Sequence, residues 1–229
     1  MRQLYIFLTG PMLWLSFIVF FGGLAYRVVT YIRGLDWQLD GVAYQAHPGL
    51  GIKGALRSII HWLIPFYSVG WRAKPLYTVI FFLFHIGVVG VPLFLVGHAV
   101  ILKERWGVDW PTMSMGLADL LTIGVMVTAV ALAIRRLGLP EVRIVTTLYD
   151  YFLILVSVAP FVTGFLAVHQ APPDYNLWLI VHVLCGELLL ILIPTTKLWH
   201  VVGFFLSRGQ LGADFGIKRA WKAKGGFAW

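Results

Sequence analysis

Residues 177–206, LWLIVHVLCGELLLILIPTTKLWHVVGFFL, decide the fold class of this chain. The stretch is almost continuously apolar, and its only charged side chains are Glu187 and Lys197. About 20 apolar residues are enough for a helix to cross the hydrocarbon core of a bilayer. The stretch therefore predicts a membrane-spanning helix rather than the core helix of a soluble protein.

Four more stretches have the same character, at residues 5–31, 76–102, 113–134 and 145–168. Over its 229 residues the chain is 59% hydrophobic and 12% charged, with a mean hydropathy of +0.83. A soluble domain carries about twice that charged fraction. We therefore predict an all-α integral membrane protein with five transmembrane helices, which form one domain over residues 1–206.

The basic residues predict the orientation of the helices. All Lys and Arg except Arg2, Lys103 and Arg105 lie near the first or third connection between helices, or at the C-terminal end. The positive-inside rule then places the N-terminus outside and the C-terminus in the cytoplasm. Residues 34–74 are expected to include a cytoplasmic helix in the membrane interface, and residues 207–229 a basic cytoplasmic tail. This distribution explains the formal charge of +8 without a nucleic-acid partner.

Histidines within the predicted helices are the main chemical signal of the sequence. The second helix contains His85 and His98, and the fifth contains His182 and His200. In a straight helix the last two, 18 residues apart, lie on one face with roughly 27 Å of rise between them. They are too far apart to share a metal ion, so each is expected to serve a different cofactor. Ionisable residues inside a membrane are functional candidates by default.

Depth in the membrane pairs these histidines between two antiparallel helices. His85 is expected opposite His200 near the cytoplasm, and His98 opposite His182 near the outer side. Two such pairs are what bis-histidine ligation of two b-type haems requires. Polar packing between helices is the alternative interpretation, and His61 is the alternative inner ligand. Glycines near the histidines are expected to give a flat macrocycle room: Gly87, Gly90, Gly97 and Gly186.

Three other side chains are candidates for quinone binding or proton transfer: Glu187 deep in the fifth helix, His169 at the outer end of the fourth, and Lys103 at the outer rim. The alternatives are a protonated Glu187 bonded to a neighbouring helix, a surface histidine and an ordinary rim charge. No catalytic residue for bond-making chemistry is recognisable. The single cysteine, Cys185, excludes a C-x-x-C-H haem attachment site, an iron–sulfur cluster and an internal disulfide.

The chain also resembles a known family. Its five helices, its length and its paired histidines look like the cytochrome b (gamma) subunit of respiratory nitrate reductase. Four motifs are more closely similar to the membrane cytochrome of the high-molecular-weight cytochrome c complex of sulfate-reducing bacteria. These motifs are FLTGPMLW at 7–14, RGLDW at 33–37, LPEVR at 139–143 and SRGQLG at 207–212.

The resemblance covers essentially the whole chain and implies a role in sulfate respiration or a related pathway. It implies a multi-pass protein of the bacterial inner membrane with two haem b groups, held by the four histidines at the matching positions. The implied partners are a cytoplasmic iron–sulfur subunit, other membrane subunits, and a menaquinone pool or periplasmic multihaem cytochromes. Two other classes stay open: a proton-coupled transporter with Glu187 and the histidines as its relay, and a structural membrane anchor without haem.

Overall fold

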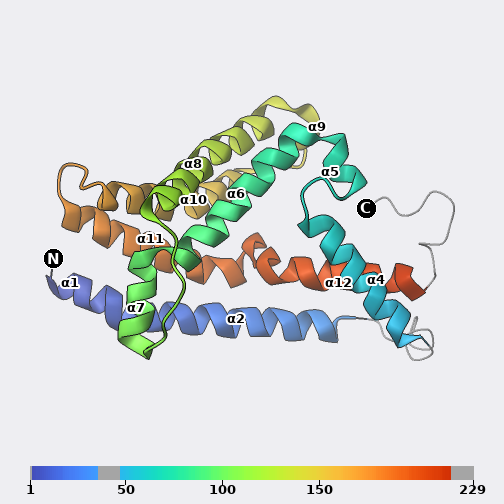
Figure 1. The fold of residues 1–229 in the computed structure, drawn as a ribbon, viewed down its shortest axis with the longest axis horizontal. Coiled ribbons are helices and arrows are strands. Elements are labelled where there is room, and N and C mark those ends of the chain that lie inside the picture. The colour runs from blue at the N-terminus through green and yellow to red at the C-terminus, as the bar shows by residue number, and fades with distance from the viewer. Residues whose placement is uncertain (1, 36–46, 218–229) are drawn as a thin grey trace. The chain divides into compact units, whose positions relative to one another are not determined.

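The computed structural model describes residues 2–35 and 47–217, and the regular elements of this part of the chain are all helical (Figure 1). Five helical segments are long and apolar enough to cross a membrane: Arg2–Arg33, Pro75–Phe94, Met115–Gly138, Leu148–Val168 and Tyr175–Thr195. The prediction of an all-α protein with five long apolar helices is therefore confirmed for the described residues, and these helices are consistent with a multi-pass membrane protein of five spans. The orientation of the spans stays a prediction.

The chain forms two compact units. Unit 1 contains Met1–Trp14 and Val79–Leu189, and unit 2 contains Leu15–Thr78 and Leu190–Trp229. The first span begins with α1 (Arg2–Phe7) and a π-helical turn (Leu8–Met12) around Pro11, and it continues as α2 (Leu13–Arg33). A π-helical turn is a common way to accommodate a distortion inside a helix.

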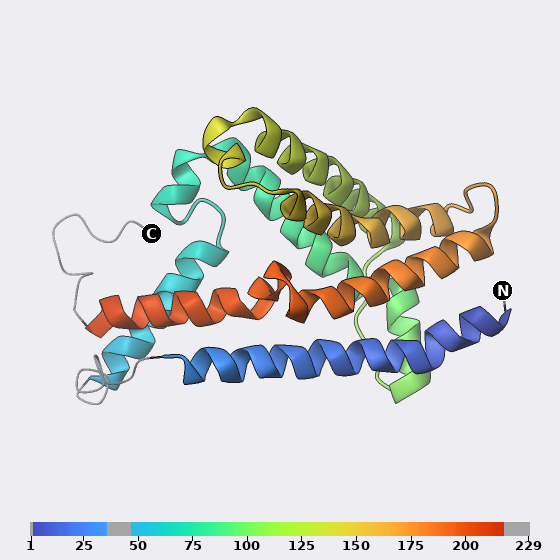
Figure 2. The ribbon, with the colours of Figure 1, turned by 180° about the vertical axis from the view of Figure 1, so that it is seen from behind.

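The core of unit 1 is formed by three helices: α6 (Pro75–Phe94), α8 (Met115–Gly138) and α10 (Leu148–Val168). α8 and α10 run side by side (Figure 2). α6 approaches α8 closely at Gly87, because a Cβ there would clash with Val125 and come within 3.0 Å of the Leu121 carbonyl oxygen. The buried side chains of the core are Phe84, Val91, Val125, Ala129 and Phe161.

Hydrogen bonds from side chains fix where two of these helices begin. The Ser114 hydroxyl accepts the backbone N–H of Leu117 at the start of α8, at 3.4 Å. At the start of α10, the Asp150 carboxylate accepts the Thr147 backbone N–H at 2.8 Å and its hydroxyl at 2.9 Å, in a capping box. Such caps satisfy N–H groups that have no partner within the helix. As a result, α8 begins at Met115 and α10 at Leu148, whereas the predicted stretches begin at residues 113 and 145.

The second predicted helix, at residues 76–102, is not continuous. α6 ends at Phe94, Leu95 is extended with φ −68° and ψ 133°, and the chain resumes as α7 (Val96–Trp106). Pro92 lacks an N–H and its ring crowds the preceding turn, which weakens the helix here. His98 therefore lies on a separate helix from His85.

The fifth predicted helix, at residues 177–206, is also interrupted. α11 (Tyr175–Thr195) ends one residue after Pro194, a 3-10 turn follows at Lys197–Trp199, and α12 (His200–Ile217) begins there. Arg27 binds the freed end of α11, with its Nε 2.8 Å from the Pro194 carbonyl oxygen. The prediction that His182 and His200 share one face of a straight helix is therefore wrong.

Unit 2 contains α4 (Pro48–Leu63), α5 (Val69–Ala73) and α12. α4 lies against α12 (Figure 1). The contact is made by glycines on both helices, since a Cβ at Gly212 would lie 2.6 Å from the Ser58 Cβ. Small residues allow this close approach. The predicted tail begins at residue 207, but α12 continues past that position. Residues 218–229 of the predicted tail and residues 36–46 of the predicted interfacial segment lie outside the described residues.

Candidate functional site

His98 of α7 and His182 of α11 lie beside each other in unit 1. Their ring centroids are 6.0 Å apart and their planes differ by 8°. Two imidazoles that bind one metal ion from opposite sides have centroids about 6 Å apart. Each metal–nitrogen bond is about 2 Å long, and each ring centroid lies about 1 Å beyond its nitrogen. The separation therefore suits a single metal ion between two imidazoles. The structure brings together the two histidines that were expected to form the outer pair, and their ligand role stays a prediction.

Backbone carbonyls orient both rings. Nδ1 of His98 is 2.8 Å from the Pro92 carbonyl oxygen, and Nδ1 of His182 is 2.8 Å from the Pro160 carbonyl oxygen. A carbonyl oxygen can only accept a hydrogen bond, so we assign the proton of each neutral ring to Nδ1. Nε2 then keeps its lone pair, which is the form that binds a metal ion.

Two backbone carbonyls and one glycine create these positions. The Pro92 carbonyl lies in the last turn of α6, where carbonyls lack helical partners. His182 reaches the Pro160 carbonyl because Gly164 faces the imidazole: a Cβ there would lie 2.9 Å from both Nδ1 and Cε1. Sequence reasoning missed Gly164. A helical proline followed four residues later by glycine is the local signal that could have indicated it.

The expected inner histidines belong to different units. His85 lies on α6 in unit 1, with Nδ1 2.8 Å from the Phe81 carbonyl oxygen. His200 is the first residue of α12 in unit 2, with Nδ1 3.0 Å from the Lys197 carbonyl oxygen. Both rings therefore have the same tautomer as the outer pair. The pairing of His85 with His200 stays a prediction, as does His61 as a substitute.

The glycines near the histidines differ in what surrounds them. A Cβ added at Gly90, Gly97 or Gly186 would have no heavy atom within 4 Å, so these glycines border open space. Gly87 differs, because its missing side chain makes room for α8. In the described ranges no three His, Cys, Asp or Glu side chains group around a common point. A donor set of two imidazoles fits haem iron, whereas a structural zinc site needs four ligands.

The three quinone or proton candidates have different surroundings. Glu187 is 2% exposed, and neither of its carboxylate oxygens has a hydrogen-bond partner among the residues that the structure describes. His169 lies 3.3 Å from the Asp119 carboxylate, and Lys103 lies 2.7 Å from the Asp109 carboxylate. A buried carboxyl group without a partner calls for an explanation. Glu187 is therefore the strongest of the three candidates, although its role stays a prediction.

No family model matches this chain, and no solved structure matches it. A protein of Nitratidesulfovibrio vulgaris is 57% identical to it over 228 residues, which cover 99% of this chain and 100% of the other. The two proteins belong to the same family. The match spans all five apolar helices, so it supports a multi-pass membrane protein with a bacterial homologue. The likeness to nitrate reductase cytochromes stays a prediction.

Proposed function

We propose that this chain is a di-haem b-type cytochrome that carries electrons across the bacterial inner membrane as a subunit of a respiratory complex. The observation that carries the proposal is the His98–His182 pair. Its rings are 6.0 Å apart and nearly parallel, and each is held through Nδ1, which leaves the Nε2 lone pair for a metal ion. Haem, when bound, supplies one-electron transfer.

The role of this chain is to bind and orient two haems and to keep water away from them. His98 and His182 would hold the outer haem, and His85 and His200 the inner one. The hydrogen bonds from Nδ1 to backbone carbonyls fix the orientation and the tautomer of each ring. The apolar helices surround the site with a low-dielectric medium, which helps to set the potential of a haem.

The proposed partners follow from the resemblance to nitrate reductase cytochromes. Electrons would pass between a cytoplasmic iron–sulfur subunit and either menaquinone or periplasmic multihaem cytochromes. Glu187 would exchange protons with a quinone near the outer haem, because it is buried, has no hydrogen-bond partner in the described part of the chain and lies five residues after His182. The N-terminus would lie outside and the C-terminus in the cytoplasm.

The haem content of the protein purified with its partner subunits tests this function. We expect two haems for each copy of this chain and a sharp visible band after reduction with dithionite. Iron–sulfur partners do not give this band, and the c-type haem of a multihaem partner stays covalently bound during acid–acetone extraction. The extracted haem therefore reports on b-type haem alone. A proton-coupled transporter or a structural anchor would carry no haem, and a preparation without extractable b-type haem would rule out the proposal in favour of one of them.

Replacing Gly164 with alanine is expected to disturb the outer haem without unfolding the protein. The new Cβ would lie 2.9 Å from the His182 ring, so the imidazole must shift by a few tenths of an ångström or more. Electron paramagnetic resonance of the oxidised protein should show one of the two low-spin haem signals altered. The control is Gly116→Ala, where a Cβ meets nothing within 4 Å. Unchanged signals in the Gly164 variant would contradict the placement of His182 at a haem.

A further inference from the structure

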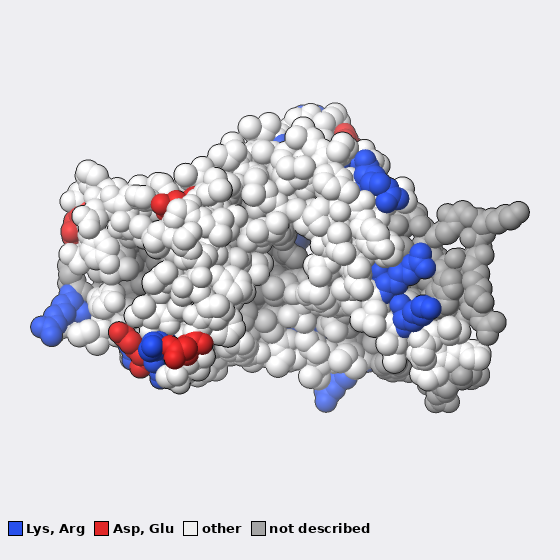
Figure 3. Space-filling view, viewed as in Figure 1, with Lys and Arg blue, Asp and Glu red and all other residues white. Residues whose placement is uncertain are grey.

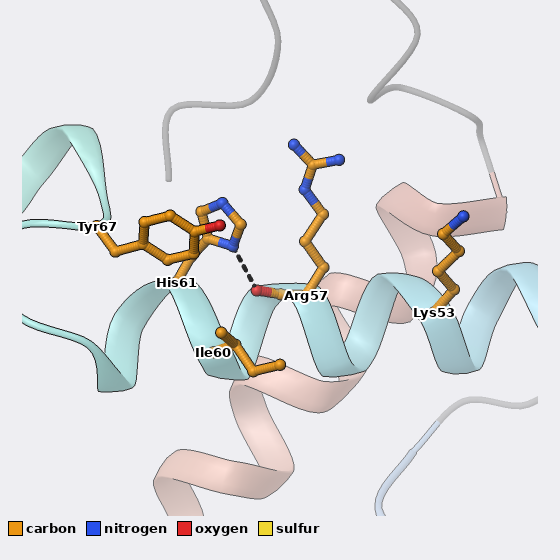
Figure 4. Close-up of a pocket in the computed structure, with 5 residues that line it drawn as sticks. All are labelled: Lys53, Arg57, Ile60, His61 and Tyr67. Atoms are coloured by element: carbon orange, nitrogen blue, oxygen red, sulfur yellow. Dashed lines mark hydrogen bonds between the residues drawn. The ribbon is translucent and has the colours of Figure 1, made fainter.

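Unit 2 contains an exposed pocket of about 500 Å³ beside α4, lined by Lys53, Arg57, Ile60, His61 and Tyr67. Three of these side chains, Lys53, Arg57 and His61, recur every four residues and therefore share one face of the helix. Figure 4 shows Lys53, Arg57 and His61 rising from the same side of α4, with Tyr67 beside the imidazole. In Figure 3 Lys and Arg side chains gather over this helix.

The loop after α4 completes one wall of the pocket. Phe66 has a φ of 59°, in the left-handed region that non-glycine residues seldom adopt. Arg72 holds this turn by donating to the carbonyl oxygens of Phe66 and Tyr67, at 3.4 and 3.1 Å. The turn places the Tyr67 ring against His61, with centroids 4.2 Å apart and planes 23° apart. His61 is further fixed by its Nδ1, 2.8 Å from the Arg57 carbonyl oxygen.

A second face of α4 is apolar and exposed. Ile52, Leu56 and Leu63 are 62%, 55% and 52% exposed, and their spacing puts them on one face of the helix next to the basic one. A third face, with Gly54 and Ser58, packs against α12. A helix with an apolar face beside a basic face is typical of the membrane interface, where apolar side chains enter the acyl region and cations meet lipid headgroups.

We propose that this pocket binds the phosphate of an anionic phospholipid. Arg57 and Lys53 would pair with the phosphate oxygens, and the Tyr67 hydroxyl is available as a further donor. Ile60 and the apolar face of α4 would contact the glycerol and the upper acyl chains. This combination favours a lipid over free phosphate, which has no apolar part, and over an acidic protein segment. The proposal concerns unit 2 alone and is independent of haem binding.

Lipid titration of the intact protein tests the site. Native mass spectrometry of the detergent-purified full chain would measure binding of phosphatidylglycerol, with phosphatidylcholine and inorganic phosphate in parallel. The variant is Lys53→Gln/Arg57→Gln, and the matched control is Arg33→Gln/Lys74→Gln, which removes the same charge from exposed positions of the same unit. We expect the first variant to bind phosphatidylglycerol roughly 30-fold more weakly than the wild type, at about 1 kcal/mol for each cation removed, and the control to bind it normally.

Each outcome bears on the lipid site. Preference for phosphatidylglycerol over phosphatidylcholine, lost only in the Lys53/Arg57 variant, supports it. Equal loss in both variants would show a general charge effect and overturn it. Displacement of the lipid by equimolar inorganic phosphate would assign the pocket to the free anion instead. Normal lipid binding by the Lys53/Arg57 variant, together with loss of the partner subunits on purification, would assign the surface to a protein contact.

Discussion

Replacing His182 with alanine is expected to halve the haem content, from two haems to one for each chain. The alanine side chain offers no ligand, and His98 alone cannot complete bis-histidine coordination. The fold should persist, because His182 makes one hydrogen bond to the backbone, and such a bond contributes about 1 kcal/mol. Haem extraction and the reduced-minus-oxidised spectrum of the purified variant measure the loss.

Paired substitutions make this prediction specific to the site. His98→Ala should remove the same haem, so the His98→Ala/His182→Ala double variant should still retain one. The control is His169→Ala, which removes an imidazole that pairs with Asp119 and should leave both haems in place. If the double variant had no haem while each single variant kept one, His98 and His182 would belong to different sites.

Replacing Gly212 with leucine is expected to separate α4 from α12 and to lower stability markedly. A Cβ at this position would lie 2.6 Å from the Ser58 Cβ and 2.9 Å from the Ala55 Cα. The clash involves backbone and therefore cannot be relieved by rotating a side chain. The change would also displace the Arg208 guanidinium, which donates to the Ser58 hydroxyl at 3.1 and 3.2 Å. We expect a loss of about 3 kcal/mol, or roughly 6–12 °C in melting temperature.

The matched control is Gly209→Leu, three residues earlier on α12. A Cβ at Gly209 meets only the end of the Ile59 side chain, at 3.9 Å, so leucine should be accommodated. Both variants would be melted in the same detergent and lipid mixture and followed by circular dichroism. Equal melting temperatures for the two variants would show that the helices do not pack through Gly212.

The spans could be predicted from the sequence, but the breaks within them could not. Hydropathy depends on composition alone, and it located all five apolar helices. A helical proline, by contrast, has more than one outcome: α10 runs on through Pro160, whereas α6 and α11 end shortly after Pro92 and Pro194. The result depends on which distant groups bind the freed carbonyls, as Arg27 does at Pro194. Those contacts are absent from any local pattern.

In the candidate site, the meeting of two histidines could be predicted from the sequence, but the groups that orient them could not. The expected depths of His98 and His182 indicated that they would meet, because two antiparallel helices bring equal depths together. The atoms that orient the rings lie on other elements: the Pro160 carbonyl and Gly164 belong to α10, which contains no predicted ligand. The expected pairing of His85 with His200 depends on a straight fifth helix, and the chain instead breaks at Thr196.

An experimental density map of the whole complex, resolved well enough to show the rings, tests the central claim most directly. We predict a flat macrocycle between α7 and α11, with its iron bonded to Nε2 of His98 and Nε2 of His182 at about 2 Å. The two Nδ1 atoms should remain on the Pro92 and Pro160 carbonyls. A map in which lipid, water or another side chain fills the space between the two imidazoles would contradict the account.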